Sequence, residues 1–286
     1  MKIPVILLNY NSSSDCRKCV ADLKRQEGVE LEIIIVDNCS QKEDASAVEE
    51  LAAEQGCAFI AAKENRGYNA GNNIGLRYAA EKGYTYVLIA NPDMEFPQQD
   101  YIMRLTEEMA KRADVVVAAT DIISPEVSHQ NPMISDPKGW TSSFNWITAI
   151  WNRSSKETPD FIGDFKTSNV CKKVSGCCLM VRMDFIKRIG FFDEQVFLYC
   201  EEAILSKQVE QAGMHMYYIA DLQAVHRHIK SAKGNARKRF KAWISSRLYF
   251  ERHYNYQSWL SYAMKTIGWR IYLVVFCLVD SVRRNR

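Results

Sequence analysis

The sequence has no apolar run close to the roughly 20 residues that a membrane-spanning helix needs. Its run Ile271–Val279 has nine residues, and we expect that this segment does not cross a bilayer. Near the N-terminus, the stretch Ile3–Leu8 contains Pro4 and stops at Asn9. That stretch is too short for the apolar core of a signal peptide, so we expect a protein that is not exported.

The sequence also lacks a paired cysteine framework. Nine cysteines, an odd number, are scattered from Cys16 to Cys277, which is typical of reduced thiols in the cytosol. Cys16 and Cys19 form one C-x-x-C, but no second pair follows at zinc-ribbon spacing. Both fall in an expected helix, where packing is a more common role than metal binding.

Neither a G-x-G-x-x-G nor a G-x-x-x-x-G-K-[ST] motif is present, which argues against the usual dinucleotide and P-loop sites.

The composition, 47% hydrophobic and 25% charged over 286 residues, is that of a globular protein with a large core. Its charge is uneven, because residues 227–286 carry 14 Lys and Arg against two acids, while residues 1–226 carry 23 against 32. A basic tail attracts diphosphates, anionic lipids or nucleic acid. The run Arg227–Lys241 lacks the interleaved aromatics of nucleic-acid platforms, which favours diphosphate or lipid phosphate.

Apolar runs alternate with amphipathic stretches through the first 120 residues. The predicted strands are Ile3–Leu8, Leu31–Val36, Cys57–Ala62, Tyr84–Ala90 and Val115–Ala119. The predicted helices are Asp15–Gln26, Asp44–Gln55, Ala70–Lys82 and Gln98–Arg112. Such alternation indicates βαβ units and an α/β fold with a mostly parallel sheet, of the type that binds nucleotides.

The second half is less regular. Residues 121–167 lose periodicity and are rich in Pro and Trp, which fits either an acceptor-side lid or a partly disordered insertion. After them we predict regular structure at Lys173–Arg182, a helix at Glu201–Ala212, strands at Met214–Ile219 and Leu222–Val225, and helices at Ala242–Tyr254 and Ser258–Val282. The last helix, aromatic and fringed by arginines, could lie in a membrane interface or pack on the body or in a dimer.

Two carboxylates stand where predicted strands end. Asp93 follows the run Tyr86–Ala90 across a Pro92 turn, at the strand edge where open α/β sheets bind ligands. This position suits a metal ligand, although a turn or helix-cap aspartate is the alternative. Asp37 ends the second strand, where its carboxylate could accept the imide N–H of uracil or thymine.

Two further groups have the residue types of a site. Asn65, Gly67 and Gly71 open a turn and the following helix, where small residues let backbone donors approach a nucleotide; ordinary turn chemistry is the alternative. Glu201 and Glu202 are adjacent carboxylates at the start of a helix. Burial beside a second acid raises a pKa toward that of a general base, although acids are common in any first turn.

In order along the chain, these motifs resemble the family 2 inverting glycosyltransferases, and in particular their rhamnosyltransferase-like branch. The motifs are Leu8-Asn9-Tyr10-Asn11, Val36-Asp37-Asn38, Asn65-x-Gly67, Gly71-x-Asn73-x-Gly75, Asn91-Pro92-Asp93, Val174-Ser175-Gly176, Gly190-Phe191-Phe192-Asp193-Glu194, Glu201-Glu202 and His226. The resemblance covers nearly the whole chain. It implies a GT-A fold, that is, a Rossmann-like sheet flanked by helices, together with a nucleotide-diphosphate sugar donor and a divalent metal, Mn²⁺ or Mg²⁺.

The resemblance also implies roles for single residues. Asp93 and His226 would hold the metal, and Glu202, with Glu201 beside it, would be the catalytic base. The residues implied in donor binding are Asn9, Asp37, Asn65, Gly67, Gly71, Asn73, Asn91, Asp93 and Arg247. The chain departs from the family pattern at Asn91 in place of an acid, at Glu202 in place of Asp, and at Leu248 in place of the Asn that usually follows the arginine.

We therefore expect a metal-dependent enzyme that moves a sugar from a UDP- or dTDP-sugar to a glycan hydroxyl. We expect no nucleic-acid partner, and a chain that is able to form oligomers. The expected acceptor is a lipid-linked surface polysaccharide intermediate at the cytoplasmic face of the membrane. Residues 1–235 would form the GT-A domain, with a nucleotide-sugar half (1–120) and an acceptor half (121–235), and residues 236–286 a basic, membrane-associating helical extension. The alternative is a non-catalytic nucleotide-sugar binder or a scaffold of a polysaccharide assembly complex.

Overall fold

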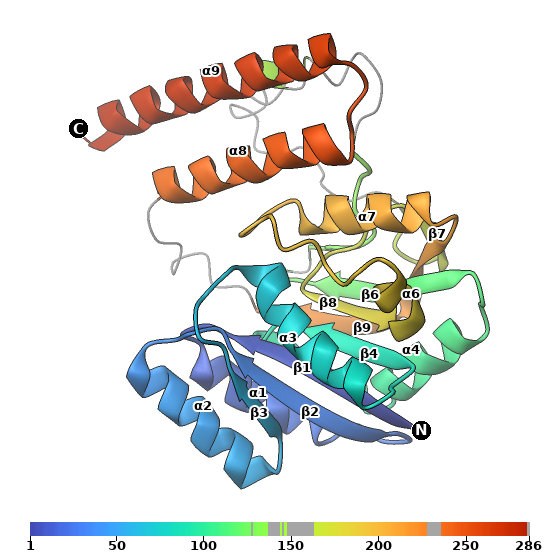
Figure 1. Ribbon diagram of the computed structural model, residues 1–286. Helices are drawn as coiled ribbons and strands as arrows, with labels where there is room; N and C mark the ends of the chain where they lie inside the picture. The colour runs from blue at the N-terminus through green and yellow to red at the C-terminus, as the bar shows by residue number, and fades with distance from the viewer. Residues whose placement is uncertain (127, 137–143, 145, 148–162, 228–235, 285–286) are drawn as a thin grey trace.

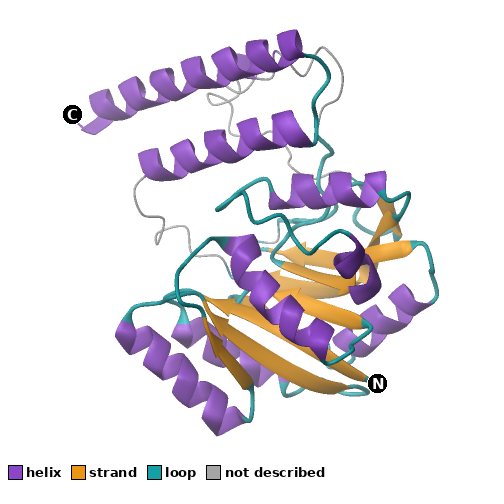
Figure 2. Ribbon diagram, viewed as in Figure 1, coloured by secondary structure: helices purple, strands orange, loops and turns teal. Residues whose placement is uncertain are grey.

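The fold is built on one mixed sheet with helices on both faces and a pair of long C-terminal helices beyond it (Figures 1 and 2). The computed structural model describes residues 1–284 except 127, 137–143, 145, 148–162 and 228–235. Within these residues the strands are β1 (Lys2–Asn9), β2 (Glu30–Asp37), β3 (Ala58–Ala61), β4 (Tyr86–Ala90), β5 (Met94–Glu95), β6 (Val115–Ile123), β7 (Asn169–Cys171), β8 (Cys178–Arg182) and β9 (His215–His226). The helices are α1 (Ser13–Leu23), α2 (Lys42–Gln55), α3 (Tyr68–Glu81), α4 (Tyr101–Ala110), α6 (Met183–Arg188), α7 (Glu201–Gln211), α8 (Ala236–His253) and α9 (Trp259–Arg284).

The sheet order is β3-β2-β1-β4-β8-β6-β9-β5, with β7 also paired to β9. The four strands β1 to β4 are parallel to one another, as the βαβ pattern predicts. Strand β8 runs antiparallel between β4 and β6, a placement that the sequence pattern did not indicate. The predicted α/β class with a mostly parallel sheet and GT-A-like layers is confirmed.

Successive residues of the strands pack on opposite faces, because side chains alternate along a strand. In β1, Val5 and Leu7 join a core cluster with α1, α2 and α4. Ile6 and Leu8 join a second cluster with α3, α6 and α7. Burial on both faces explains why these strands read as unbroken apolar runs in the sequence. Cys16 and Cys19 lie in the first cluster, fully buried in α1.

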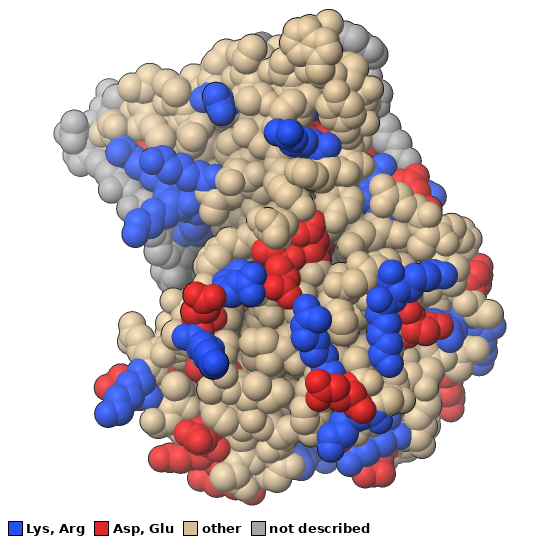
Figure 3. Space-filling model, viewed as in Figure 1, with Lys and Arg blue, Asp and Glu red and all other residues tan. Residues whose placement is uncertain are grey.

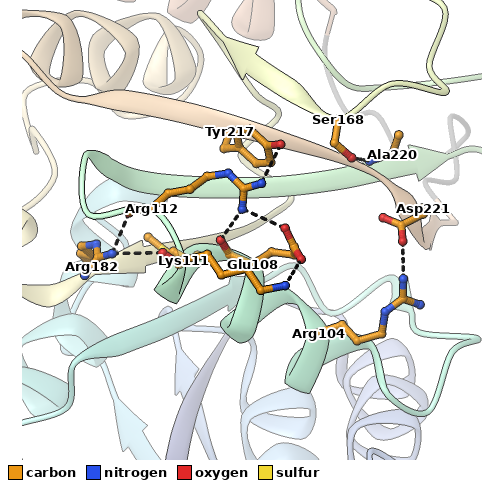
Figure 4. A network of polar contacts seen from close by, with 10 residues as sticks. Arg104, Glu108, Lys111, Arg112, Ser168, Arg182, Tyr217, Ala220 and Asp221 are labelled. Atoms are coloured by element: carbon orange, nitrogen blue, oxygen red, sulfur yellow. Dashed lines mark hydrogen bonds and ion pairs between the residues drawn. The ribbon is translucent and has the colours of Figure 1, made fainter.

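The end of α4 is tied to the sheet by an arginine network (Figure 4). Arg182 of β8 donates hydrogen bonds to the carbonyl oxygens of Met109, Arg112 and Val115 at 2.8–3.0 Å. The guanidinium of Arg112 lies 4.0 Å from the ring centre of Tyr217 in β9. These bonds join the C-terminal end of α4, the turn that follows it and the start of β6 to β8, so this network supports the fold and lies apart from the strand ends discussed below.

Two predicted boundaries differ in the structure. The strands predicted at Met214–Ile219 and Leu222–Val225 form the single strand β9, because the apparent break is a register shift: Thr120 pairs with Ile219 and the next residue, Asp121, with Gln223. Such a bulge interrupts the alternation while the strand continues.

The predicted loop at 121–167 falls in about equal parts on described residues and on residues outside the described ones. Of its described part, Met133 and Asp136 line a cavity.

The expectation that the last helix cannot cross a bilayer is wrong on length and composition. Helix α9 contains a stretch, Trp259–Ser281, that is long and apolar enough to span a membrane, and 22% of it is buried in this structure. The expectation counted only Ile271–Val279 and omitted the aromatic and small residues that precede that run. Length and composition alone do not show insertion, since core helices of water-soluble proteins pass the same test.

Candidate active site

The carboxyl ends of three neighbouring parallel strands bring the candidate residues together. Asn9 ends β1 and pairs in register with Asp37, the last residue of β2. Both are buried, and Asn9 Nδ2 donates to Asp37 Oδ1 at 2.9 Å while the Ser40 N–H donates to Oδ2 at 3.1 Å. Asn9 therefore holds Asp37 in place, and its predicted contact with a donor stays a prediction. The predicted role of Asp37 toward the base stays a prediction.

A first cavity, the Asp93 cavity, opens beside these strand ends with a volume of about 440 Å³. It is lined by Leu8, Tyr10, Ser12, Asn38, Asn65, Gly67, Tyr68, Asn91, Pro92, Asp93, Phe197 and Leu198. Four of the residues predicted to bind the donor are thus in one place: Asn65, Gly67, Asn91 and Asp93. The cavity includes a carboxylate, several amides and exposed backbone, the mixture that small-molecule sites use to orient a ligand.

Gly67 allows the far wall of this cavity to form. Its φ is +101°, and a Cβ there would lie 2.2 Å from the carbonyl oxygen of Phe197. The same oxygen accepts a hydrogen bond from the backbone N–H of Tyr68 at 3.0 Å. Any side chain at this position would push away the segment Phe197–Leu198, so the glycine is required by close approach as well as by its φ.

Gly71 and Asn73 do not line the Asp93 cavity, and their predicted roles in donor binding stay predictions. A Cβ on Gly71 would lie 2.5 Å from Leu8 Cδ1, so this glycine lets α3 pack closely on β1. The buried side chain of Asn73 donates to the Phe192 carbonyl at 2.8 Å and accepts from the Phe192 N–H at 3.0 Å. Asn73 therefore fastens the Gly190–Glu194 segment to α3, and its amide is already bonded on both sides.

A second cavity, the Glu201 cavity, adjoins the first with a volume of about 510 Å³. It is lined by Tyr68, Asn91, Met133, Asp136, Lys173, Ser175, Gly176, Cys177, Leu198, Tyr199, Cys200, Glu201, Glu202, Ala203, His226, Trp243 and Arg247. Tyr68, Asn91 and Leu198 belong to both cavities. The Tyr68 hydroxyl lies 2.7 Å from the Gly176 carbonyl oxygen and 3.2 Å from Asn91 Oδ1, so it stands at their boundary.

Asp93 and His226 meet at this boundary because β5 pairs with β9, with Met94 opposite His226. Asp93 Oδ1 is 3.3 Å from His226 Nε2, and His226 Nδ1 is 2.9 Å from Gln130 Oε1. Burial opposes the imidazolium, but hydrogen bonds to Asp93 and Cys177 outweigh it and raise the pKa of His226 to about 10. The short pairing explains how two residues 133 positions apart come to share one site.

The chemistry of this pair fits a divalent metal that also binds a ligand. A carboxylate and an imidazole suit Mn²⁺, and Mg²⁺ is commonly held by one or two carboxylates together with substrate phosphates. Among the described residues no group of three or more His, Cys, Asp or Glu side chains could hold a metal alone. A metal here would therefore need oxygens from a diphosphate or water, and His226 would have to release its proton.

Glu201 and Glu202 begin α7 after two consecutive residues with left-handed backbone, Tyr199 (φ +76°) and Cys200 (φ +67°). Glu201 Oε1 accepts the Tyr199 N–H at 2.7 Å, and Glu202 Oε1 accepts the Gly176 N–H at 3.3 Å. Burial, and then the negative charge of Glu202, raise the pKa of Glu201 to about 7. Non-glycine residues at positive φ cost energy and cluster at functional sites, which agrees with the use of this turn to present two acids to the cavity.

Arg247 lies in the Glu201 cavity instead of the Asp93 cavity, where a donor-binding arginine would be expected. It forms ion pairs with Asp136 and, at 2.6 Å, with Glu251. Asp136 also pairs with Lys173 at 2.9 Å. Burial opposes ionisation of Asp136, but Arg247 and Lys173 outweigh it and hold the pKa of Asp136 below its usual value. This cavity thus contains an ionised carboxylate besides the glutamate pair.

Sequence reasoning did not identify Tyr68, Asp136, Lys173 or Trp243 as site residues. Tyr68 directly follows Gly67, so its position in the turn was a usable signal. Asp136 stands in the aperiodic segment, and Trp243 and Arg247 lie one turn apart on α8. For these, only the packing of α8 against the body reveals the site.

Comparison with known proteins agrees with this arrangement. The model of Glycosyl transferase family 2 matches residues 5–190. The low-salt glycan biosynthesis hexosyltransferase Agl10 of Haloferax volcanii is 24% identical over 78% of this chain and 66% of its own length. The dTDP-rhamnosyl transferase RfbF of Shigella flexneri is 23% identical over 78% of this chain and 68% of its own. The solved structure of GalNAc-T7 with UDP, GalNAc and Mn²⁺ shares the fold, with a TM-score of 0.65 and 14% identity over 88% of this chain and 48% of that one. The chain therefore spans just under two thirds of the hexosyltransferase and about half of the solved relative.

Proposed function

Because this chain belongs to Glycosyl transferase family 2, we propose that it moves a sugar from a UDP- or dTDP-sugar to a hydroxyl of a glycan acceptor, with inversion at the anomeric carbon. The observation that carries this proposal is the junction of the two cavities at Tyr68 and Asn91. Asp93 lines one cavity and the Glu201–Glu202 pair the other, and His226, which lines the Glu201 cavity, contacts Asp93 at the junction. A donor and an acceptor in these cavities would meet there.

The donor is proposed to fill the Asp93 cavity, with its diphosphate next to Asp93 and His226. A metal bound by these two side chains would stabilise the negative charge that develops on the departing diphosphate. The nucleotide choice is supported by two relatives: RfbF is named for a dTDP-sugar, and the GalNAc-T7 structure contains UDP and Mn²⁺. Asp37, held by Asn9 and Ser40 at the end of β2, is the proposed acceptor for the imide N–H of the base.

The acceptor is proposed to enter the Glu201 cavity. Glu202 takes the proton of the acceptor hydroxyl as its oxygen forms a bond to the anomeric carbon, and the bond from that carbon to the diphosphate breaks on the opposite side. Glu201, whose pKa is raised to about 7 by burial and then by the charge of Glu202, is about half protonated at neutral pH and lies beside the proposed base as the second acid of the pair. General bases work best when such pairs are tuned near the operating pH.

The proposed place of action is the cytoplasmic face of a membrane, on a lipid-linked surface glycan. Its support comes from α9, whose residues Leu260, Ile267, Ile271, Val274 and Leu278 are exposed and spaced at seven, four, three and four positions along one helical face. On the face shown in Figure 3, the outer surface of α9 carries few charges, while basic side chains gather near the N-terminal end of α8. Apolar area together with basic charge is the pair of signals that reversible membrane binding needs.

A thermal-shift screen of UDP-, dTDP- and GDP-sugars with and without Mn²⁺ tests the proposal, since a ligand of the native state raises its melting temperature. We expect one nucleotide class to stabilise the protein, more strongly with Mn²⁺. A parallel assay of nucleoside diphosphate release separates an enzyme from a non-catalytic binder. Stabilisation without release of diphosphate, or no stabilisation by any sugar nucleotide, would overturn the catalytic proposal.

A further inference from the structure

Helix α9 packs against helix α8, and α8 supplies two residues that line the Glu201 cavity, Trp243 and Arg247. Two of the α9 side chains, Lys265 and Trp269, lie one turn apart and are 2% and 4% exposed. Both face α8, which runs beside α9 (Figure 1). A lysine buried to this degree is rare unless it is paired, so its partners show what the burial achieves.

The first route from α9 to the cavity is ionic. Lys265 Nζ lies 2.7 Å from Glu251 Oε2, and Glu251 Oε1 lies 2.6 Å from Arg247 Nη2. Arg247 in turn pairs with Asp136, and Asp136 pairs with Lys173. Charges of alternating sign therefore run without a break from α9 to three residues that line the cavity.

This chain of ion pairs limits where Arg247 can lie. Each of its two terminal nitrogens is bonded to a different carboxylate, Asp136 or Glu251, and its Nε is buried without a hydrogen-bond partner among the described residues. Removing one partner of a buried ion pair leaves the other charge uncompensated, which strongly destabilises the folded state. Lys265 and Asn255 both bond Glu251 Oε2, so without Lys265 the charge of Glu251 would be left to Arg247 and Asn255, and we expect Arg247 to shift relative to Asp136.

The second route is aromatic. The ring of Trp269 meets the ring of Trp243 edge to face, with centroids 4.9 Å apart and an interplanar angle of 79°. Trp243 is partly exposed and lines the Glu201 cavity. Such edge-to-face pairs contribute about 0.5–1.5 kcal/mol beyond area burial, and here the pair fixes the orientation of a ring that borders the cavity.

We propose that Lys265 and Trp269 are positioning residues that hold Arg247, Asp136 and Trp243 as the acceptor-binding wall of the cavity. This inference rests on the proposed function and specifies its acceptor: a sugar ring that packs its C–H face on Trp243 and donates a hydroxyl to Asp136. The helix whose outer face suits a membrane would then also form, through its inner face, part of the acceptor site. Among the described residues, none of those that line the Asp93 cavity belongs to α8 or α9, so donor binding should not depend on this support.

The test compares Lys265→Met with the wild type in two assays. Donor hydrolysis is measured without acceptor, using UDP-glucose and dTDP-rhamnose. Transfer is measured to a panel of p-nitrophenyl glycosides at varied concentration. We expect Lys265→Met to raise the acceptor KM about tenfold or more while the donor KM and hydrolysis stay within twofold, and we expect Lys265→Arg to restore most of the acceptor KM.

Arg270→Met is the matched control, because it removes one positive charge from an exposed position of the same helix. It should leave the acceptor KM unchanged. If Lys265→Met fails to fold, the double variant Glu251→Gln with Lys265→Met removes both buried charges, and it should still show the raised acceptor KM because Arg247 has lost its second anchor.

The outcomes separate the two proposals. A wild-type protein without any hydrolysis or transfer overturns the proposed function. A wild type that hydrolyses donors but transfers to no glycoside overturns the sugar-acceptor wall. If the wild type is active and the Lys265 variants have an unchanged acceptor KM, only the positioning role of α9 is overturned, and the proposed function stands.

Discussion

Replacing Glu201 by Gln should stabilise the folded protein above neutral pH. In the native structure, burial and the charge of Glu202 raise the pKa of Glu201 from its usual 4.5 to about 7. A folded-state pKa above the unfolded value means that ionisation costs stability. This cost is absent below about pH 4.5, grows as the pH rises toward 7, and is complete above 7.

The size of the effect follows from the shift. At about 1.36 kcal/mol for each pKa unit, ionising Glu201 costs the folded state about 3 kcal/mol at pH 8. Glutamine keeps the shape of the side chain and still accepts the Tyr199 N–H through its Oε1, so it removes the cost without losing that bond. For a chain of this length the melting temperature should rise by roughly 5 °C at pH 8.

The assay is thermal unfolding of wild type and Glu201→Gln at pH 5 and pH 8. Glu210→Gln is the control, because it neutralises a more exposed carboxylate on the same helix that pairs with Lys207, and it should change stability by less than about 1 kcal/mol. An equal gain at both pH values would mean that the charge of Glu201 is not the cause. No gain in melting temperature at pH 8 would refute the argument that ionised Glu201 lowers the stability of the folded protein.

Four further outcomes are expected. Asp93→Asn should keep the fold but remove the Mn²⁺ dependence of sugar-nucleotide binding in a thermal-shift titration, and unchanged dependence would rule out this metal site. Glu202→Gln should keep donor affinity and lower kcat for transfer roughly 10²-fold or more, because a base acts in the transition state; a larger loss in Glu201→Gln would exchange the two roles. Asp37→Ala should weaken UDP or dTDP binding measured by calorimetry, and equal affinity would make Asp37 a turn residue. Val274→Glu with Leu278→Glu should release the protein from anionic liposomes in sedimentation while sparing donor hydrolysis, and binding by the wild type should fall as salt screens charges over about 10 Å at 0.1 M; a wild type that never sediments would refute the membrane proposal.

Local patterns predicted the parallel half of the sheet well, because β1, β2 and β4 are largely buried on both faces and their apolar runs stand out between amphipathic helices. The runs Ile3–Leu8 and Leu31–Val36 match β1 and β2 to within one or two residues. The position of β8 could not be predicted in this way, because a strand that inserts antiparallel between β4 and β6 is chosen by long-range pairing. Strand β5 has two residues, too few for any periodicity.

The site residues also divide into those that local sequence predicted and those that only long-range pairing brings together. The strand-end rule placed Asp93 and Asp37 at the correct edge of the sheet from local sequence alone. His226 was identified only through family resemblance, since its approach to Asp93 depends on the pairing of β5 with β9. Lys265 gave no signal at all, because a lysine on an amphipathic helix normally faces solvent, and its burial follows from the carboxylate of Glu251 on another helix.

The burial of Lys265 also changes how the C-terminal helix should be tested. Deleting residues 257–286 would remove the exposed apolar face of α9, and at the same time it would leave Glu251, 1% exposed, without its lysine partner. A loss of transfer in such a truncation would therefore have two explanations, detachment from the membrane and a disordered acceptor wall. Substitutions on the outer face at Val274 and Leu278 leave Lys265 and Trp269 in place, while substitutions at Lys265 leave the outer face intact. Because the two faces of one helix can be changed independently, membrane attachment and acceptor positioning can be assigned separately in this protein.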